Sequence, residues 1–452
     1  MISNPVAALR NQGRLAAIGL SLLVVAYLAW KVGQSPQQAL QFAFNGLAVG
    51  AIYALLAMGF TLVYSTVWFF DLYYGAAATL GAYGVFYLRS SDALYGRYEV
   101  ANPVINIVLA VVVGGVIAWA VHAGPLARLQ DKLPKPAYRG VVAALGLSGG
   151  AYTLALLSYP EHLRLLLAPA IGLAVAVLAG RLVIWLLGQI TAGSGNGAKA
   201  LAGMVGIAVG VAAGILLAGA DGSELYLSWL LTCLLAGSVG LALYRGLYVH
   251  MRERANSPLI MLVASLGVLL SFTAFISIAF ESAPRPLPET FGSTSISVAG
   301  AYIKGFNIFA IGVALLGFAA MWIMLQKTAF GRAVRAIGDD EQVAKVVGIN
   351  TVVVVSIVFF IGAAYAALAG LLSGHDTAIQ PKMGLLLLLK GWIASVVGGI
   401  GNLYGAILGG FVLGMVEQFG IWDLAGEWRD AIAFVLLILF LSFWPNGLLP
   451  RK

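Results

Sequence analysis

Long apolar stretches recur along the whole chain, and they constrain the fold more than any other feature of the sequence. A helix rises 1.5 Å per residue, so about 20 apolar residues are enough to cross the ~30 Å hydrocarbon core of a bilayer. We predict about fourteen spans, at residues 15–31, 41–63, 66–88, 103–122, 140–158, 163–189, 199–219, 226–244, 258–280, 305–326, 351–373, 384–400, 403–420 and 430–445.

The composition supports a protein that folds in lipid. Hydrophobic residues make up 61% of the chain and charged residues only 10%, whereas soluble domains carry about 25% charged residues. This excludes an ordinary soluble enzyme and a disordered chain. The predicted fold class is an all-α, polytopic membrane protein with about 12–14 hydrophobic segments. The Gly-rich segments, 41–63, 66–88, 384–400 and 403–420, are candidates for broken or re-entrant helices.

The net charge of +8 has two explanations, nucleic-acid binding or an asymmetric membrane protein. When the N-terminus is placed inside, Lys and Arg outnumber acidic residues in the inside loops, and the reverse holds outside. We therefore predict that both termini are cytoplasmic and that the chain has no nucleic-acid partner. Arg10 and Arg14 precede the first apolar stretch as in a signal peptide, but residues 26–31 form a poor cleavage site, so we expect a retained helix.

The sequence contains no signature of a catalytic or metal site. The histidines, His122, His162, His250 and His375, lie in separate segments, and no H-E-x-x-H or G-x-S-x-G motif occurs. Residues 193–199 lack the G-x-x-x-x-G-K-[ST] order of a phosphate loop, so we interpret them as a turn. We predict no metal, no cofactor and no ATPase site. The single cysteine excludes an intramolecular disulfide.

The most polar internal segment, 327–350, contains the signals of a short helix. Asp339 and Gln342 have the spacing of a capping box, and Glu341 lies in the first turn, where the helix dipole favours negative charge. Gly348 suits a left-handed C′ position. A helix of about 12 Å is not stable alone. It is either a surface turn or a helix that docks on a cytoplasmic partner through its apolar residues, Val343, Ala344, Val346 and Val347.

This segment resembles the cytoplasmic coupling loop, E-A-A…G, of ABC importer permeases, through Glu341-x-x-Ala344-x-x-x-Gly348. Further segments resemble permeases of branched-chain amino acid (leucine/isoleucine/valine) importers, and the matches cover about 40–125 and 245–450. They are Asn45-Gly46-x-x-x-Gly50-Ala51-Ile52-Tyr53, Gly331-Arg332-Ala333-x-Arg335-Ala336, Ile361-Gly362-Ala363-Ala364-Tyr365, Lys390-Gly391-Trp392-x-Ala394-x-Val396-Val397-Gly398-Gly399 and Trp444-Pro445-Asn446-Gly447.

The resemblance implies a permease subunit in a bacterial cytoplasmic (inner) membrane. It implies a second, related permease subunit, two ATP-binding subunits and an external substrate-binding protein as partners. The solutes it implies are branched-chain or other amino acids, with urea or short amides as the alternative. The residues it implies for coupling to the ATPase are Arg332, Arg335, Asp339, Asp340, Glu341, Ala344 and Gly348.

Two departures separate the chain from the family pattern. Residues 140–244 add four hydrophobic spans, which leave the orientation of both flanks unchanged because their number is even. We therefore divide the chain into 1–125, an insertion at 126–245, and 246–452. The second departure is Asp71-Leu72-Tyr73-Tyr74-Gly75, where the family usually has Asn-Phe-Ala-His-Gly, and it argues against ordinary branched-chain specificity.

Four ionisable residues fall within predicted spans, where a charge needs a partner or a watery cavity. Arg181 is expected to snorkel to the interface. Lys390 and Glu417 lie at similar depth, which favours an ion pair and leaves a transport role open. Asp71 is a candidate pathway or gating residue, with a local structural role as the alternative. The translocation-path candidates are Asn45, Asp71, Tyr74, Gly75, Lys390 and Glu417.

The Gly-x-x-x-Gly pairs beginning at Gly46, Gly405 and Gly410 predict close helix packing. The outer loop 284–304 is either a contact for the binding protein or a plain connector. Two other functions remain open. One is a secondary transporter or channel in which Asp71 and Lys390 relay protons or ions. The other is a membrane scaffold built on 140–244.

Overall fold

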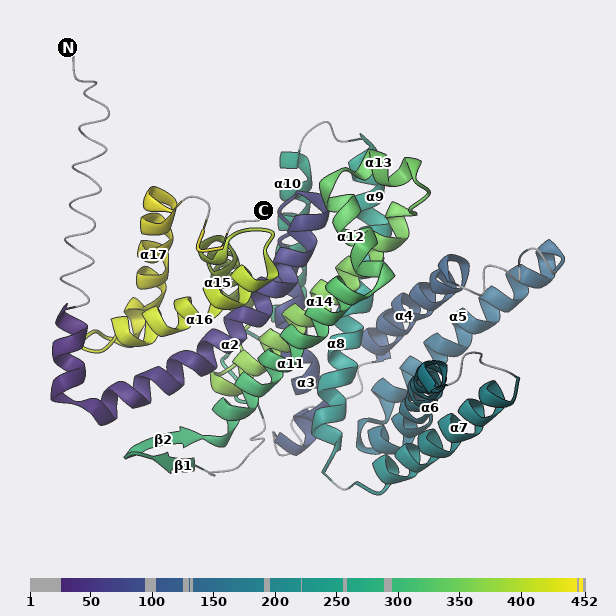
Figure 1. Cartoon of the computed structure of the whole chain (residues 1–452), viewed down its shortest axis with the longest axis horizontal. Coiled ribbons are helices and arrows are strands. Elements are labelled where there is room, and N and C mark those ends of the chain that lie inside the picture. The colour runs from purple at the N-terminus through teal and green to yellow at the C-terminus, as the bar shows by residue number, and fades with distance from the viewer. Residues whose placement is uncertain are drawn as a thin grey trace, which may run out of the picture. The chain divides into compact units, whose positions relative to one another are not determined.

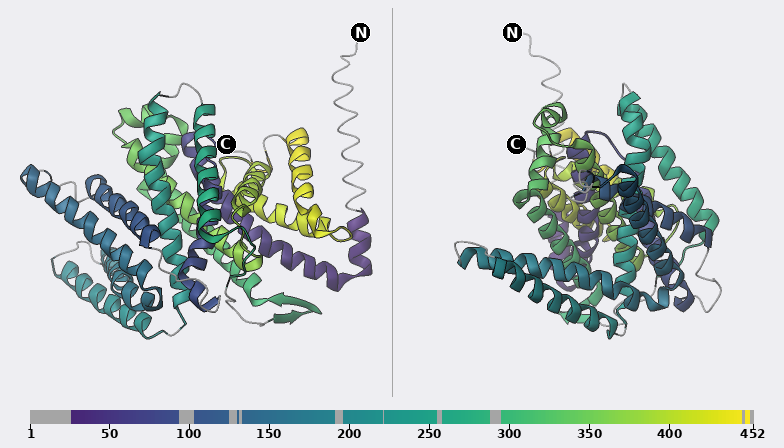
Figure 2. Two further views of the ribbon diagram at one scale, coloured as in Figure 1. Left: turned by 180° about the vertical axis from the view of Figure 1, so that it is seen from behind. Right: turned by 90° about the vertical axis from the view of Figure 1, so that its right-hand side faces the viewer.

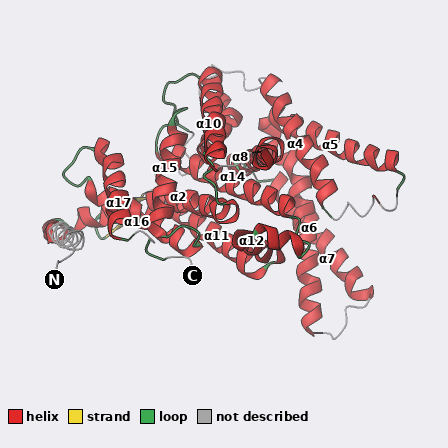
Figure 3. Cartoon of the chain, turned by 90° about the horizontal axis from the view of Figure 1, so that it is seen from above, coloured by secondary structure: helices red, strands yellow, loops and turns green. Residues whose placement is uncertain are grey.

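The computed structural model describes residues 26–93, 103–124, 130, 133–190, 196–220, 222–254, 258–287, 295–444 and 447–449. Their secondary structure is almost entirely helical, with one short pair of strands, which confirms the all-α prediction (Figure 3). The predicted first span, 15–31, lies largely outside the described residues. Of the turn predicted at 193–199, residues 193–195 lie outside them, and 196–199 form the first turn of a helix instead.

The chain forms two compact units. Unit 1 comprises Met1–Ala82 and Leu243–Lys452, and unit 2 comprises Tyr83–Ala242. The four-span insertion at 126–245 stays a prediction, because the division into two units does not tell which residues are an addition to the family pattern.

Unit 1 is built around α2, the long purple helix of Figure 1. Its other elements are the start of α3 (Tyr73–Ala93), the π-helical segment η3 (Tyr244–Tyr248), α9 (Val249–Arg254), α10 (Pro258–Phe280), β1 (Ser295–Val298), β2 (Ala301–Lys304), α11 (Gly305–Lys327), α12 (Ala329–Asp339), α13 (Glu341–Val346), α14 (Thr351–Asp376), α15 (Met383–Gly398), α16 (Leu403–Gly420), η4 (Gly426–Trp428) and α17 (Arg429–Phe443). Helix α2 itself spans Pro36–Val67.

Unit 2 contains helical hairpins. Helix α4 packs on α5, and α6 packs on α7. The elements are the remainder of α3, α4 (Pro103–Ala123), α5 (Lys135–Ser158), η2 (Pro160–His162), α6 (Leu163–Ile190), α7 (Asn196–Ala218) and α8 (Glu224–Leu243). The predicted snorkelling residue, Arg181, is exposed on α6.

Ten helices among the described residues are long and apolar enough to cross a membrane, and α15 is a shorter apolar helix. Predicted and observed ends coincide for α10 and α16. Of the four Gly-rich segments that were candidates for broken helices, 41–63, 384–400 and 403–420 fall almost wholly within the continuous helices α2, α15 and α16, whereas 66–88 is interrupted by the non-helical link 68–72 between α2 and α3. Which side of the membrane each end faces stays a prediction.

The glycines of unit 1 allow backbones to touch, as the Gly-x-x-x-Gly pairs predicted. A Cβ on Gly410 of α16 would lie 2.4 Å from the backbone nitrogen of Ala54 on α2, and one on Gly414 would lie 2.4 Å from that of Gly50. A Cβ on Gly409 would lie 2.0 Å from the carbonyl oxygen of Ala394 on α15. Lipid supplies no hydrophobic driving force between helices, so these helices associate through the close van der Waals packing that small residues allow.

Strands β1 and β2 form an antiparallel hairpin that the sequence analysis did not predict (Figure 2). Ala299 and Gly300 form its two-residue turn with φ of 50° and 85°, the conformation that matches the twist of a tight hairpin. The hairpin is attached to α2, where the Gln41 side-chain oxygen accepts a 2.8 Å hydrogen bond from the Tyr302 amide.

Candidate functional site

The loop between α11 and α14 folds into two helices rather than the single one predicted. Thr328 caps α12 by accepting a 3.1 Å hydrogen bond from the amide of Gly331. Asp339, expected to cap the short helix, is instead the last residue of α12. Asp340 is the N-cap of α13, and its Oδ1 accepts from the amides of Gln342 and Val343 at 2.8 and 3.0 Å. The predicted N-cap was wrong by one residue, because α12 extends through Asp339 and leaves Asp340 to cap α13.

Glu341 fixes α13 to a neighbouring helix. Its carboxylate pairs with Arg252 of α9 through Oε2 and with Lys345 of α13 through Oε1, the latter at 3.0 Å. Burial raises the pKa of Glu341, but the hydrogen bond from Lys345 and the charge of Arg252 outweigh it and hold the pKa below its ordinary value. Glu341 is therefore a charged anchor for α13.

The apolar residues of α13 divide into an inner and an outer set. Ala344 is buried. The side chains of Val343, Val346 and Val347 are 58%, 86% and 68% exposed. Gly348 has φ of 85°, as predicted for the C′ position. We call Val343, Val346 and Val347 the valine face.

The two arginines of the predicted coupling set lie on the exposed side of α12. Arg332 and Arg335 are both exposed. Arg335 also donates to the carbonyl oxygen of Leu325, which ties α12 back to the end of α11. The α12–α13 loop thus exposes two positive charges from α12 and the valine face from the α13 end.

The link between α2 and α3 contacts this loop. Trp68 ends α2 with a left-handed φ of 55°, and its indole nitrogen donates a 2.8 Å hydrogen bond to the carbonyl oxygen of Gly338 in α12. Asp71 lies in the same link, so it does not belong to a helical span as the sequence suggested. It is buried, and its Oδ1 accepts from the Tyr248 hydroxyl at 2.8 Å and the Tyr73 amide at 3.0 Å.

Tyr74 and Gly75 lie in the tightly packed start of α3. The Tyr74 hydroxyl is buried without a hydrogen-bond partner among the described residues and lies against Gly362 of α14, where a Cβ would approach it to 1.8 Å. A Cβ on Gly75 would lie 2.8 Å from the carbonyl oxygen of Gly384 in α15. This packing brings three segments of unit 1 together at one point.

A network of charges joins α2, α15, α16 and α17. Lys390 lies 3.3 Å from Glu417 Oε2 and 2.9 Å from Asp430 Oδ1. The Tyr53 hydroxyl donates to Glu417 at 2.8 Å and lies 2.9 Å from the Lys390 ammonium. The structure therefore shows the expected Lys390–Glu417 ion pair. The sequence analysis missed Tyr53 and Asp430, although Asp430 was visible as an acid in the first turn of the next helix.

Asn45 belongs to a separate polar group on α2. Its side-chain oxygen accepts from Gln41 at 3.3 Å and from Asn307 of α11 at 3.2 Å. The described hydrogen bonds do not connect this group to Asp71 or to Lys390. The six translocation-path candidates thus lie in three local clusters rather than in one site.

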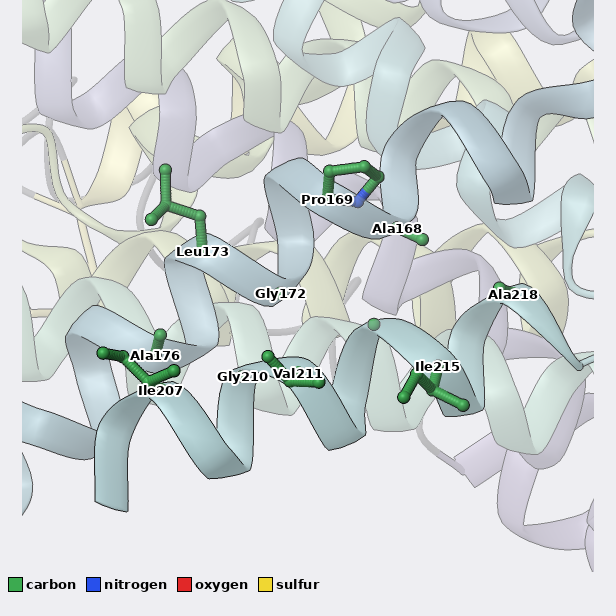
Figure 4. Close-up of a pocket in the computed structure, with 11 residues that line it drawn as sticks. Ala168, Pro169, Gly172, Leu173, Ala176, Ile207, Gly210, Val211, Ile215 and Ala218 are labelled. Atoms are coloured by element: carbon green, nitrogen blue, oxygen red, sulfur yellow. The ribbon is translucent and has the colours of Figure 1, made fainter. Parts of the chain in front are cut away.

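One hollow lies beside the charge network and another lies in unit 2. One of about 10 Å³ borders Lys390 and Asp430, and it has the size of roughly one water molecule. The other, of about 440 Å³, lies in unit 2 between α6 and α7 (Figure 4). Figure 4 shows that Leu173, Ile207 and Ile215 line it together with glycines and alanines, so it suits hydrocarbon and not a polar solute. No cluster of metal-ligand side chains occurs within the described ranges.

Comparison with known proteins gives a consistent result. The family model of the branched-chain amino acid transport system permease component matches residues 197–441. The permease protein LivH of Salmonella typhimurium, from a high-affinity branched-chain amino acid transport system, is 34% identical over 236 residues, which are 50% of this chain and 76% of LivH. BraD of Pseudomonas aeruginosa, with the same description, is 33% identical over 205 residues, 44% of this chain and 66% of BraD.

A relative that matches over a shorter stretch belongs to a different transport system. The autoinducer 2 import permease LsrC of Yersinia enterocolitica is 35% identical over 147 residues, 30% of this chain and 41% of LsrC. No solved structure matches the chain. The matching model and the coverage of LivH establish that this chain belongs to the family of branched-chain amino acid transport permeases, multi-pass proteins of the bacterial inner membrane.

Proposed function

We propose that the chain is the membrane-spanning permease subunit of an ABC importer that moves small polar solutes, foremost branched-chain or other amino acids, into the cell. Two ATP-binding subunits, a second permease subunit and an external substrate-binding protein complete it. The chain has no ATPase site of its own, because its sequence lacks a phosphate loop. Both termini and the α12–α13 loop face the cytoplasm.

The valine face carries this proposal. A six-residue helix is too short to be stable alone, yet α13 is capped by Asp340 and tied to α9 through Glu341. The fold thus stabilises a helix whose apolar residues, Val346 above all, stay exposed. An exposed apolar group outside the spans is typical of a surface for another protein. We assign this surface to the ATP-binding subunit.

The translocation-path residues have different support. Lys390 has two carboxylate partners, so its contacts favour helix pairing over solute binding. Asp71 and Tyr74 are buried and each keeps an oxygen without a hydrogen-bond partner among the described residues. We propose Asp71 and Tyr74 as the stronger path candidates. Gly75, the next residue in the chain, and Asn45, in its separate polar group on α2, remain candidates beside them.

The test is copurification of the ATP-binding subunits of the importer with this chain. Val346→Asp places a charge on the valine face and is expected to abolish copurification. The matched control is Ile296→Asp, because Ile296 is also an exposed apolar residue, in β1. It precedes the 23-residue α11, which separates the hairpin from α12 by about 35 Å. Copurification unaffected by Val346→Asp would refute this function for α13.

A further inference from the structure

The segment formed by η3 and α9 makes polar contacts at two points that are four residues apart. Tyr248, the last residue of η3, is fully buried and donates its hydroxyl to Asp71 in the α2–α3 link at 2.8 Å. Arg252, in α9, pairs with Glu341 in α13. Residues four apart lie on one side of a helix, about 6 Å apart along its axis. One short helical segment therefore contacts both the coupling loop and the link.

The Tyr248 end is held by aromatic packing as well as by its hydroxyl. The ring of Tyr248 lies 5.6 Å from that of Phe69 in the link and 5.7 Å from that of Phe359 in α14. Phe69 and Phe359 lie 6.1 Å apart. These rings fix the position of Tyr248, so its hydroxyl meets Asp71 in a defined geometry.

The Asp71 carboxylate depends on this contact. Asp71 is buried, and its Oδ2 has no hydrogen-bond partner among the described residues. Without the Tyr248 hydroxyl, the amide of Tyr73 is the one hydrogen-bond donor that the described residues direct at the carboxylate. A buried carboxylate that loses a donor is strongly disfavoured, so the link is expected to change its position when Tyr248 moves away.

The π-helical form of η3 is relevant here. A π-helical turn is rare and is found frequently at functional sites. Five residues, Tyr244–Tyr248, adopt it immediately before α9. Tyr248 is therefore the residue at which the π-helical segment joins α9.

We propose that Arg252 and Tyr248 are positioning residues that transmit movement of α13 to the α2–α3 link. This inference rests on the proposed function, in which the ATP-binding subunit moves α13. A pull on Glu341 displaces Arg252 and, through the same helical segment, Tyr248. The Tyr248–Asp71 hydrogen bond then moves the link, from which α3 begins. The direct contact of Trp68 with Gly338 holds the other side of the link to α12.

The test follows the link by cysteine labelling in the assembled importer. A Leu72→Cys probe is introduced in a Cys233→Ser background, and its maleimide labelling rate is measured with and without ATP and vanadate. The rate is expected to change with nucleotide. Tyr248→Phe keeps the ring and removes the hydroxyl. It is expected to reduce that change by about threefold or more, the effect of one lost hydrogen bond, with copurification of the ATP-binding subunits unaltered.

The matched control is Tyr365→Phe, which removes a Tyr hydroxyl that bonds to the carbonyl oxygen of Gly317 at 2.7 Å, away from this route. It is expected to keep the full nucleotide response. Arg252→Glu and Glu341→Arg are each expected to abolish the response, and the double variant is expected to restore it.

The outcomes separate the two hypotheses. If the ATP-binding subunits do not copurify with the reference protein, the proposed function fails. If they copurify but Leu72→Cys shows no nucleotide response, or Tyr248→Phe responds like Tyr365→Phe, the transmission route alone is refuted.

Discussion

Lys390 stands between two carboxylates of very different exposure, and this asymmetry leads to a quantitative prediction. The Glu417 side chain is 0% exposed and that of Asp430 is 45% exposed. Replacing Lys390 with Met leaves Glu417 buried without its cation, a loss that costs about 3–5 kcal/mol in buried pairs. Asp430→Asn removes a half-exposed charge and leaves the Lys390–Glu417 pair, so we expect a cost of about 0–1 kcal/mol.

The cost of Lys390→Met is expected to be the larger of the two because Glu417 is buried. Its Oε2 accepts from Tyr53 and faces Lys390, and its Oε1 has no hydrogen-bond partner among the described residues. When Lys390→Met is combined with Glu417→Leu, the uncompensated charge disappears and most of the stability is expected to return, because a buried pair replaced by apolar residues is often near neutral. The double variant should therefore be more stable than Lys390→Met alone.

The assay is thermal unfolding of the purified protein in one detergent, compared across the wild type, Asp430→Asn, Lys390→Met, Glu417→Leu and the Lys390→Met/Glu417→Leu double variant. A double-mutant cycle on Lys390 and Glu417 separates their interaction from effects on each site alone. The order of unfolding temperatures is expected to be wild type, Asp430→Asn, the double variant and Lys390→Met. If Lys390→Met unfolds no lower than Asp430→Asn, the interpretation of Glu417 as a carboxylate that depends on Lys390 is wrong.

Three other predictions concern the packing and the coupling loop. Gly410→Ala is expected to destabilise the fold by about 1–3 kcal/mol, because the added Cβ meets the α2 backbone. Gly312→Ala has open space around its Cβ, so it should be neutral or stabilise the fold by up to about 1 kcal/mol. Thermal unfolding of the two variants measures the difference. Asp340→Ala should cost about 1 kcal/mol through the lost cap of α13, seen as faster amide exchange there. Since the pKa of Glu341 is lowered in the fold, its stabilisation is complete above the ordinary carboxyl range and lost as pH falls through the lowered value; Glu341→Gln should remove that part of the acid dependence.

Among the described residues the sequence predicted the helices well because most apolar stretches of bilayer length form a helix; the stretch 66–88 is the exception, since the link 68–72 interrupts it. The predicted ends of α10 and α16 coincide with the observed ones. Lys390 and Glu417 could be paired from the sequence because both lie at similar depth in neighbouring spans. The loop was less predictable, since Asp339 and Asp340 are adjacent acids and only the length of α12 decides which one caps α13.

Contacts between segments that are distant in the chain could not be predicted from the sequence. Tyr248 and Asp71 are 177 residues apart, and no local pattern connects them. The hairpin was missed because its strands are only four residues long and their stability comes from α2 and α11. The helices of unit 2 were predicted, but the sequence does not indicate what unit 2 does. Apolar faces on α6 and α7 suit contact with lipid as well as contact with another protein.

The central claim is that ATP hydrolysed by partner subunits drives solute entry through this chain. The direct measurement is uptake of radiolabelled leucine into proteoliposomes that contain the purified importer, its binding protein outside and ATP inside. We predict accumulation that requires ATP, is abolished by Val346→Asp and is unaffected when pH and Na⁺ gradients are dissipated. Accumulation that follows a pH or Na⁺ gradient and proceeds without ATP would contradict the account and identify a secondary transporter.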